Sequence, residues 1–269
     1  MNGVLVIDKP AGLTSHDVVN RVRRIYQQRS VGHLGTLDPS ATGVLPLVLG
    51  NLTRLAQFYT SAEKTYEGVI RFGFATDTYD AAGTPAGPPQ DIKVSLEEVR
   101  GLGARFQGVI EQMPPPFSAK KIQGVPAYRL ARKHQDYMRS VAHEMGQQLG
   151  CGAHLSSLRR TKLGEFELSD AHTLEEADSA ASKGLLEEIL IHPRKLLPQL
   201  PTVTANEETA AHIRNGRAVN LPELSRARQV KVFCGQRELI AIATRVAGTL
   251  FHPEIVLAAD SAKQLARNT

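Results

Sequence analysis

Residues 32–47 read Gly-His-Leu-Gly-Thr-Leu-Asp-Pro-Ser-Ala-Thr-Gly-Val-Leu-Pro-Leu, and the rest of the chain is organised around them. Asp38 lies between two glycine-bearing turns, at 32–35 and 39–43, and an apolar run over 44–49 follows. Glycine gives the backbone freedom to turn, and Leu-Asp-Pro favours an extended or turn conformation at the aspartate. The pattern predicts a reactive carboxylate on a tight loop anchored by a buried strand. Taken alone, an Asp-Pro pair is more often a plain turn whose aspartate accepts backbone hydrogen bonds.

Composition sets the broad class of the protein. The chain has 269 residues, of which 42% are apolar, so it can form one large domain or a large and a small one. Its net charge is +5 and its isoelectric point about 9.3. A positive excess favours polyanionic partners such as nucleic acid, although many basic proteins bind none. Because aromatic residues make up only 5% of the chain, a broad base-stacking platform is not indicated.

Compartment and redox state follow from what the sequence lacks. Its two cysteines, Cys151 and Cys234, are far apart and have no metal-ligand spacing, so we expect small buried thiols in a reducing compartment. No apolar run approaches the roughly 20 residues that span a bilayer. The first ten residues lack the charged and apolar regions of a signal peptide. These features predict a cytoplasmic protein with no membrane partner.

Hydrophobic periodicity predicts a mixture of strands and helices. Residues 3–7 read as a buried strand, and a capping box at Thr14–Asp17 begins an amphipathic helix. Residues 64–74 alternate as a long strand, and 138–149 have a clear helical period that a glycine closes. A capping box at Ser95–Glu98 begins a further helix.

The segment 75–92 is rich in Gly, Pro, Asp and Thr, which predicts an exposed loop. Two of its aspartates, Asp77 and Asp80, could be mistaken for a catalytic carboxylate pair. A flexible polar loop is a poor place to hold such a pair, so we set them aside. A glycosidase mechanism is correspondingly weak, because no second acidic residue shares the setting of Asp38.

Residues 32–47 also carry a resemblance to a known family. They meet every fixed position of the pattern Gly-His-x-Gly-x-Leu-Asp-Pro-x-Ala-Thr-Gly-x-Leu-Pro, and the chain therefore resembles the TruB family of tRNA pseudouridine synthases. The resemblance runs from Val4 to about Phe166 and more loosely to the end. Further stretches that resemble the family are 9–15, 64–66, 112–121, 128–133, 137–139 and 150–166.

The resemblance implies an α+β fold with two domains. Residues 1–198 would form the pseudouridine synthase catalytic core, a mixed and mainly antiparallel central sheet flanked by helices. Residues 199–269 would form a small β-rich domain that resembles the PUA-type RNA-binding module. The residues themselves agree with a linker at 197–201 and with β-like runs at 229–234, 238–246 and 250–257.

For the site, the resemblance implies that Asp38 is the catalytic nucleophile and that Arg139 pairs with it. It also implies that Tyr66 stacks on the target uracil and that Leu158 packs against the same base. His33 would help to displace the base from the RNA loop rather than transfer protons. Judged from local sequence alone, Tyr66 is more often a half-buried strand aromatic and Arg139 a solvated helix arginine.

Basic residues near these motifs are candidate contacts for RNA phosphates. From sequence alone each also has a simpler interpretation as a solvated surface cation. These substrate-binding candidates are Lys9, Lys120, Arg159 and Arg160.

The activity implied by the resemblance is isomerisation of uridine to pseudouridine at position 55, in the T arm of tRNA. The uracil leaves C1′ through N1, turns and rejoins through C5, so no redox cofactor or metal is required. The sequence contains no dinucleotide fingerprint, phosphate-loop motif or His/Cys metal cluster. We expect a monomer that binds the T stem-loop. The alternative is a tRNA-binding or tRNA-folding module whose value is independent of catalysis.

One part of the chain departs from the family. Between Lys133 and Tyr137, where the family carries a few dozen residues holding core strands, this sequence has only three. Either the protein has lost those strands, or the sequence joins two pieces across a missing segment near 135–136. We favour the second explanation, because loss of central strands would leave backbone groups unpaired and apolar faces exposed.

Overall fold

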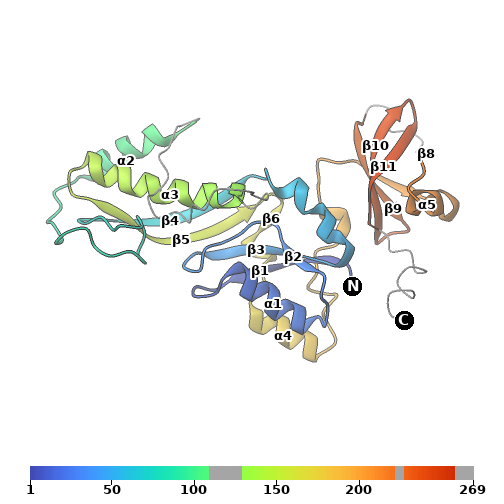
Figure 1. Ribbon diagram of the computed structural model, residues 1–269, viewed down its shortest axis with the longest axis horizontal. Helices are drawn as coiled ribbons and strands as arrows, with labels where there is room; N and C mark the ends of the chain where they lie inside the picture. Colours follow the sequence, from blue (N-terminus) through green and yellow to red (C-terminus); the bar gives the residue numbers. More distant parts are fainter. Residues whose placement is uncertain (109–128, 222–226, 258–269) are drawn as a thin grey trace.

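The computed structural model describes residues 1–108, 129–221 and 227–257, with no side-chain detail for 129–136. These residues form an α+β fold with two sheets, one in each half of an elongated molecule (Figure 1). In the first sheet the central order is β1 (Gly3–Lys9), β3 (Thr42–Leu49), β5 (Ala153–Leu163), β4 (Lys64–Phe72). Two short strands extend it, β2 (Val31–His33) beside β3 and β6 (Phe166–Glu167) beside β5. Among the described strands of this sheet only β3 and β5 pair in parallel, so the predicted mixed and mainly antiparallel sheet is confirmed.

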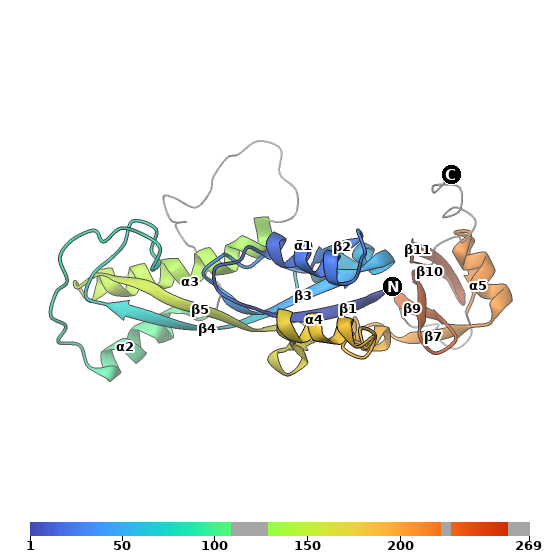
Figure 2. The same cartoon turned by 90° about the horizontal axis from the view of Figure 1, so that it is seen from below.

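Helices cover both faces of the β1–β3 part of this sheet. Two helices, α1 (Ser15–Ile25) and α4 (Leu174–Ser182), lie side by side on one face (Figure 2). The 3₁₀ helix η1 (Gly50–Tyr59) packs against the other. Successive strand side chains alternate between the two faces, so Leu5 and Ile7 join the α1 cluster while Val4 and Val6 join the η1 cluster. The predicted capping box at Thr14–Asp17 is present.

The long helix α3 (Arg129–Gln148) lies along β4 and β5 at the other end of the sheet (Figure 1). It runs without a break through Lys133–Tyr137. The expectation that the sequence joins two pieces across a missing segment near 135–136 stays a prediction. Within the described residues β4 ends the sheet, and its side chains are half-buried or exposed, as expected for a strand without a second neighbour.

Short elements complete the first half. Helix α2 (Leu96–Gly103) begins at the predicted capping box and continues into η2 (Ala104–Phe106). Two further 3₁₀ turns are η3 (Leu168–Asp170) and η4 (Pro193–Lys195). None of the helices in the described ranges has the length and apolar character to cross a bilayer.

The second sheet lies beyond the linker at 197–201. Its order is β7 (Thr202–Ala205), β9 (Gln229–Cys234), β10 (Glu238–Ala247), β11 (Leu250–Val256), β8 (Val219–Asn220), with α5 (Glu207–Arg214) packed on it. The predicted small β-rich unit is thus present. Buried Lys231 fastens it to the first half, because its ammonium donates to the carbonyl oxygens of Arg194 and Leu196 at 3.0 and 2.6 Å.

Candidate active site

The Asp38 loop connects β2 to β3 and is held by side chains from α1, β1 and, as described below, β5. Ser15, at the start of α1, accepts a hydrogen bond from the Leu37 amide at 2.8 Å and donates to the Leu37 carbonyl at 3.0 Å. Lys9, at the end of β1, donates to the Pro39 carbonyl at 3.2 Å. These contacts immobilise the backbone on both sides of Asp38, so a rigid scaffold presents its carboxylate, as predicted from the sequence.

Gly43 closes the loop where β3 meets β5. Its φ is +100°, a conformation that favours glycine. A Cβ atom built at this position would lie 2.2 Å from the carbonyl oxygen of Arg160. The close approach of the two strands therefore requires glycine here, which accounts physically for one fixed position of the 32–47 stretch.

Arg160 lies beneath the loop with its side chain fully buried. Its guanidinium donates to the carbonyl oxygens of Val44 at 2.7 Å, Gly35 at 3.0 Å and Thr36 at 3.3 Å. Burial lowers the pKa of Arg160, and the neighbouring Tyr66 phenol offsets part of that effect. An arginine nevertheless remains charged in proteins, so this buried cation ties both ends of the loop to β5.

The burial of Lys9 and Arg160 corrects their prediction as phosphate contacts. Lys9 is also fully buried, and it donates to the Leu13 carbonyl at 2.6 Å as well as to Pro39. Burial lowers its pKa from 10.5 to about 8. Neither Lys9 nor Arg160 can contact a phosphate from inside the protein, because carbonyl oxygens of the chain occupy their donors. They are scaffold for the loop.

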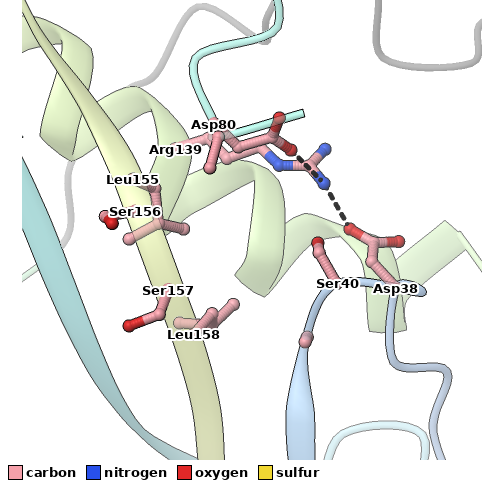
Figure 3. Close-up of a pocket in the computed structure, with 10 residues that line it drawn as sticks. Asp38, Ser40, Asp80, Arg139, Leu155, Ser156, Ser157 and Leu158 are labelled. Carbon is pink, nitrogen blue, oxygen red and sulfur yellow. Dashed lines mark hydrogen bonds and ion pairs between the residues drawn. The ribbon is translucent and has the colours of Figure 1, made fainter. Parts of the chain in front are cut away.

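Arg139 extends from α3 to the predicted partner. Its Nη2 atom lies 2.7 Å from Asp38 Oδ2, so the expected pairing is present. The same Nη2 lies 2.8 Å from Asp80 Oδ2, and one guanidinium therefore bridges two carboxylates (Figure 3). All three side chains are largely shielded from water, with exposed fractions of 18% for Arg139, 20% for Asp38 and 10% for Asp80. Charge-assisted hydrogen bonds of this length orient both partners.

Asp80 is the site residue that sequence reasoning missed. Its segment was predicted to be an exposed loop, yet Asp80 and Thr76 are buried. Asp80 accepts hydrogen bonds from the Thr78 hydroxyl at 2.7 Å and the Ala82 amide at 3.0 Å, and its backbone forms a bridge to Leu155 of β5. The signal available was Thr78 two residues before Asp80 and Gly83 three after it, a pattern typical of a hydrogen-bonded turn.

A small pocket of about 30 Å³ opens beside Asp38. This is about the share of one water molecule in the liquid, roughly 30 Å³. Leu158 lines the pocket, and its contact with the target base stays a prediction. The full lining is Asp38, Ser40, Ala41, Asp80, Ala81, Arg139, Leu155, Ser156, Ser157 and Leu158 (Figure 3).

Tyr66 and His33 are not part of the lining of this pocket. Tyr66 packs in the same cluster as Leu37 and Leu158, and its hydroxyl is buried next to Arg160. His33 has a buried Nδ1, and its pKa is lowered by burial, then by the charges of Arg160 and His16. The roles of both residues stay predictions.

The last two phosphate candidates have different outcomes. Arg159 is 38% exposed and forms a 2.7 Å ion pair with Asp8, so its charge is partly balanced inside the protein. Lys120 lies outside the described residues. Within the described ranges no group of three or more His, Cys, Asp or Glu side chains could hold a metal ion.

Comparisons with known proteins can now be set beside this geometry. Residues 23–146 match the family model for the TruB family pseudouridylate synthase N-terminal domain, and 139–197 match that for the tRNA pseudouridylate synthase B C-terminal domain. A Solibacter usitatus protein named tRNA pseudouridine synthase B is 45% identical, over 96% of this chain and all of the relative. This chain belongs to the TruB family of pseudouridylate synthases. It is thus a member of a family of isomerases.

More distant TruB relatives extend the comparison. The Dehalococcoides mccartyi protein of the same name is 34% identical, over 98% of this chain and 99% of the relative. A chain from the crystal structure of the archaeal box H/ACA sRNP Nop10–Cbf5 complex superposes with a TM-score of 0.68 at 24% identity, covering 96% of this chain and 87% of that one. That likeness shows the shared fold.

The TruB comparison also concerns the length of the chain. The alignment with the Solibacter relative spans 293 residues, more than the 269 of this chain, so the relative carries residues that this chain lacks. Neither family model extends past residue 197. The domain boundary at 198/199 and the PUA-like character of the second sheet stay predictions.

Proposed function

We propose that this chain isomerises uridine to pseudouridine in the T arm of tRNA, with Asp38 as the attacking carboxylate. The observation that carries the proposal is the placement of Asp38 on an immobilised loop at a pocket, 2.7 Å from a guanidinium. Relatives named tRNA pseudouridine synthase B support the choice of substrate.

The chemistry uses one carboxylate oxygen. Asp38 attacks the bound nucleoside at C1′ or at C6, and both routes need the same ionised and oriented oxygen. After the N1–C1′ bond breaks, the uracil turns and a C5–C1′ bond forms. The bond between the Asp38 oxygen and C1′ or C6 breaks again, which returns Asp38 to its carboxylate form. The C5 proton then leaves and N1 gains a proton, so the product is an isomer of the substrate. Arg139 balances the negative charge of Asp38 and holds its direction through the reaction.

The target nucleotide must leave its stack before it can reach Asp38. Extrusion costs a few kcal/mol, which contacts to the displaced base must offset. Leu155 and Leu158 supply an apolar wall of the pocket. In this proposal Tyr66 moves to stack on the uracil, and His33 occupies the space that the base vacates. Arg159, on the partly exposed side of β5, is the remaining described candidate for a phosphate contact.

The decisive experiment is incubation of the full chain with a T stem-loop RNA, followed by detection of pseudouridine. Asp38→Asn should abolish product while RNA affinity stays within about 3-fold, because the amide keeps the shape and loses the charge. Asp77→Asn is the matched control. Asp77 is exposed, and its contact to the Thr84 amide at 2.8 Å survives in an asparagine.

Substantial product from Asp38→Asn would refute the assignment of the nucleophile. If the wild-type chain makes no pseudouridine yet refolds tRNA as well as Asp38→Asn does, the binding and folding alternative replaces catalysis.

A further inference from the structure

Two aromatic rings lie next to the ion pairs of the site. The phenol ring of Tyr79 stacks on the imidazole of His143, with ring centroids 3.7 Å apart and planes inclined by 11°. Tyr79 immediately precedes Asp80. His143 follows Arg139 by four residues in α3, which places both on one face of the helix, one turn apart. The stack and the Asp80–Arg139 ion pair therefore join the same loop to the same helix at adjacent points.

The backbone of Tyr79 is strained. Its φ is +63°, in the left-handed region, which costs a residue with a side chain roughly 1–2 kcal/mol. The strained turn is pinned to β5, because the Leu155 amide donates to the Tyr79 carbonyl at 2.9 Å and the Ala81 amide donates to the Leu155 carbonyl at 3.0 Å. Strain that the surroundings hold in place is a reason to look for a function at that point.

The ring of His143 is held by packing rather than by hydrogen bonding at Nδ1. This atom is buried, and no described group lies within hydrogen-bonding geometry of it. Burial also lowers the pKa of His143, which favours the neutral ring at physiological pH. At a centroid separation of 3.7 Å the two ring faces are in direct van der Waals contact, so a displacement of the loop on α3 would break this contact.

We propose that Tyr79 and His143 form a positioning pair that fixes the Asp80 loop on α3, and through Asp80 sets the direction of the Arg139 guanidinium toward Asp38. The pair acts through its neighbours and touches no substrate. The inference rests on the proposed function for its kinetic consequence. Displacing a catalytic constellation by about 1 Å can lower a rate about 100-fold, so a loop free to slide on α3 would be costly.

Substitutions at position 79 can separate the effect of losing the ring from the effect of changing the backbone strain. Tyr79→Gly removes the ring but suits the left-handed backbone better than tyrosine does, so folding should not suffer through backbone strain. Tyr79→Phe keeps the ring and should restore function. Gln27→Gly is the matched control, because Gln27 is an exposed left-handed residue with φ of +47° at the end of α1, on a different element.

The measurements are the single-turnover rate of pseudouridine formation on T stem-loop RNA, the RNA dissociation constant and the thermal unfolding midpoint. We expect Tyr79→Gly to lower the rate about 10- to 100-fold with the dissociation constant within about 3-fold and the midpoint unchanged. His143→Ala should lower the rate similarly. The double variant should lose little more than either single one, because both remove one contact.

A second readout does not depend on activity. In the NMR spectrum, the Arg139 Nε–H signal, assigned through its loss in Arg139→Lys, should shift or broaden in Tyr79→Gly and stay in place in Tyr79→Phe and Gln27→Gly. If the wild-type chain is inactive, the proposed function fails, and this signal alone decides the positioning pair. Wild-type turnover together with an unmoved Arg139 signal in Tyr79→Gly would overturn the inference. A clear drop of the thermal unfolding midpoint in Tyr79→Gly, alongside the lower rate, would equally overturn the inference, since the ring would then serve folding.

Discussion

Arg160 and Arg159 are adjacent on β5, yet their removal should have very different consequences. In Arg160→Met, the carbonyl oxygens of Gly35, Thr36 and Val44 lose a fully buried donor. Each buried acceptor left unsatisfied costs about 1–3 kcal/mol. The variant no longer has to bury a guanidinium, which offsets part of the sum. We expect a net loss of about 3–5 kcal/mol, a large share of the roughly 5–15 kcal/mol that stabilises a protein.

Arg159→Met removes the same number of atoms and the same charge from the neighbouring residue. Its guanidinium is 38% exposed, and its 2.7 Å ion pair with Asp8 lies partly in water. Ion pairs of this kind contribute about 0–1 kcal/mol. The two variants therefore share their chemistry and differ in burial, which makes one the control for the other.

Urea unfolding followed by far-UV circular dichroism measures the difference, since the chain has no tryptophan to report by fluorescence. With a slope of about 3 kcal/mol per molar urea, Arg160→Met should lower the midpoint by about 1–1.7 M and Arg159→Met by less than about 0.3 M. Hydrogen exchange in the peptide 32–47 should rise sharply only in Arg160→Met. Equal midpoint shifts in the two variants, or unchanged exchange of that peptide, would refute the view that Arg160 holds the Asp38 loop.

Three further predictions follow from the same geometry. Gly43→Ala should destabilise the protein by about 2–5 kcal/mol, because its Cβ would lie 2.2 Å from the Arg160 carbonyl oxygen in a left-handed backbone. Gly12→Ala, which has open space around it, should show only the backbone strain of about 1–2 kcal/mol. The thermal unfolding midpoints of the two variants check this difference. The pKa of Lys9 in the folded protein is about 8, below its ordinary 10.5, so the unfolded chain binds more protons between pH 8 and 10.5 and wild-type stability should rise with pH across that window. The free energy of unfolding of Lys9→Met, measured at pH 7.5 and 10, should lack this part of the rise. An identical rise in both proteins would count against burial of the amine. Arg139→Lys should lower the single-turnover rate about 10- to 100-fold with RNA affinity unchanged, because the lysine side chain is one bond shorter and its ammonium cannot take the place of Nη2 between Asp38 and Asp80. Near-normal turnover would contradict a role for that bridge.

Features governed by neighbours in sequence were predicted correctly. The capping box at Thr14–Asp17 needs only groups three residues apart, and β1 needs only a continuous apolar run. The Asp38 loop follows from glycine and proline, whose backbone preferences are local. The pairing of Arg139 with Asp38, 101 residues apart, did not come from such rules and was available only through the family resemblance.

The fates of individual polar residues could not be predicted in this way. Lys9 and Arg160 have the composition of phosphate ligands, and Asp80 has that of a solvated loop residue, yet all three are buried. Whether a cation meets water or carbonyl oxygens depends on which strands pack over it. That packing joins β1, β5 and the 32–47 loop from distant parts of the chain.

The sequence by itself determined that an aspartate would stand on a rigid turn before a buried strand, because the torsion angles of a few adjacent residues decide that outcome. Only the tertiary structure decided which cations support that turn, which carboxylate joins Arg139, and that residues 129–148 form one helix. Burial and ion pairing depend on distances between residues far apart in the chain, and these distances exist only once the sheet has formed.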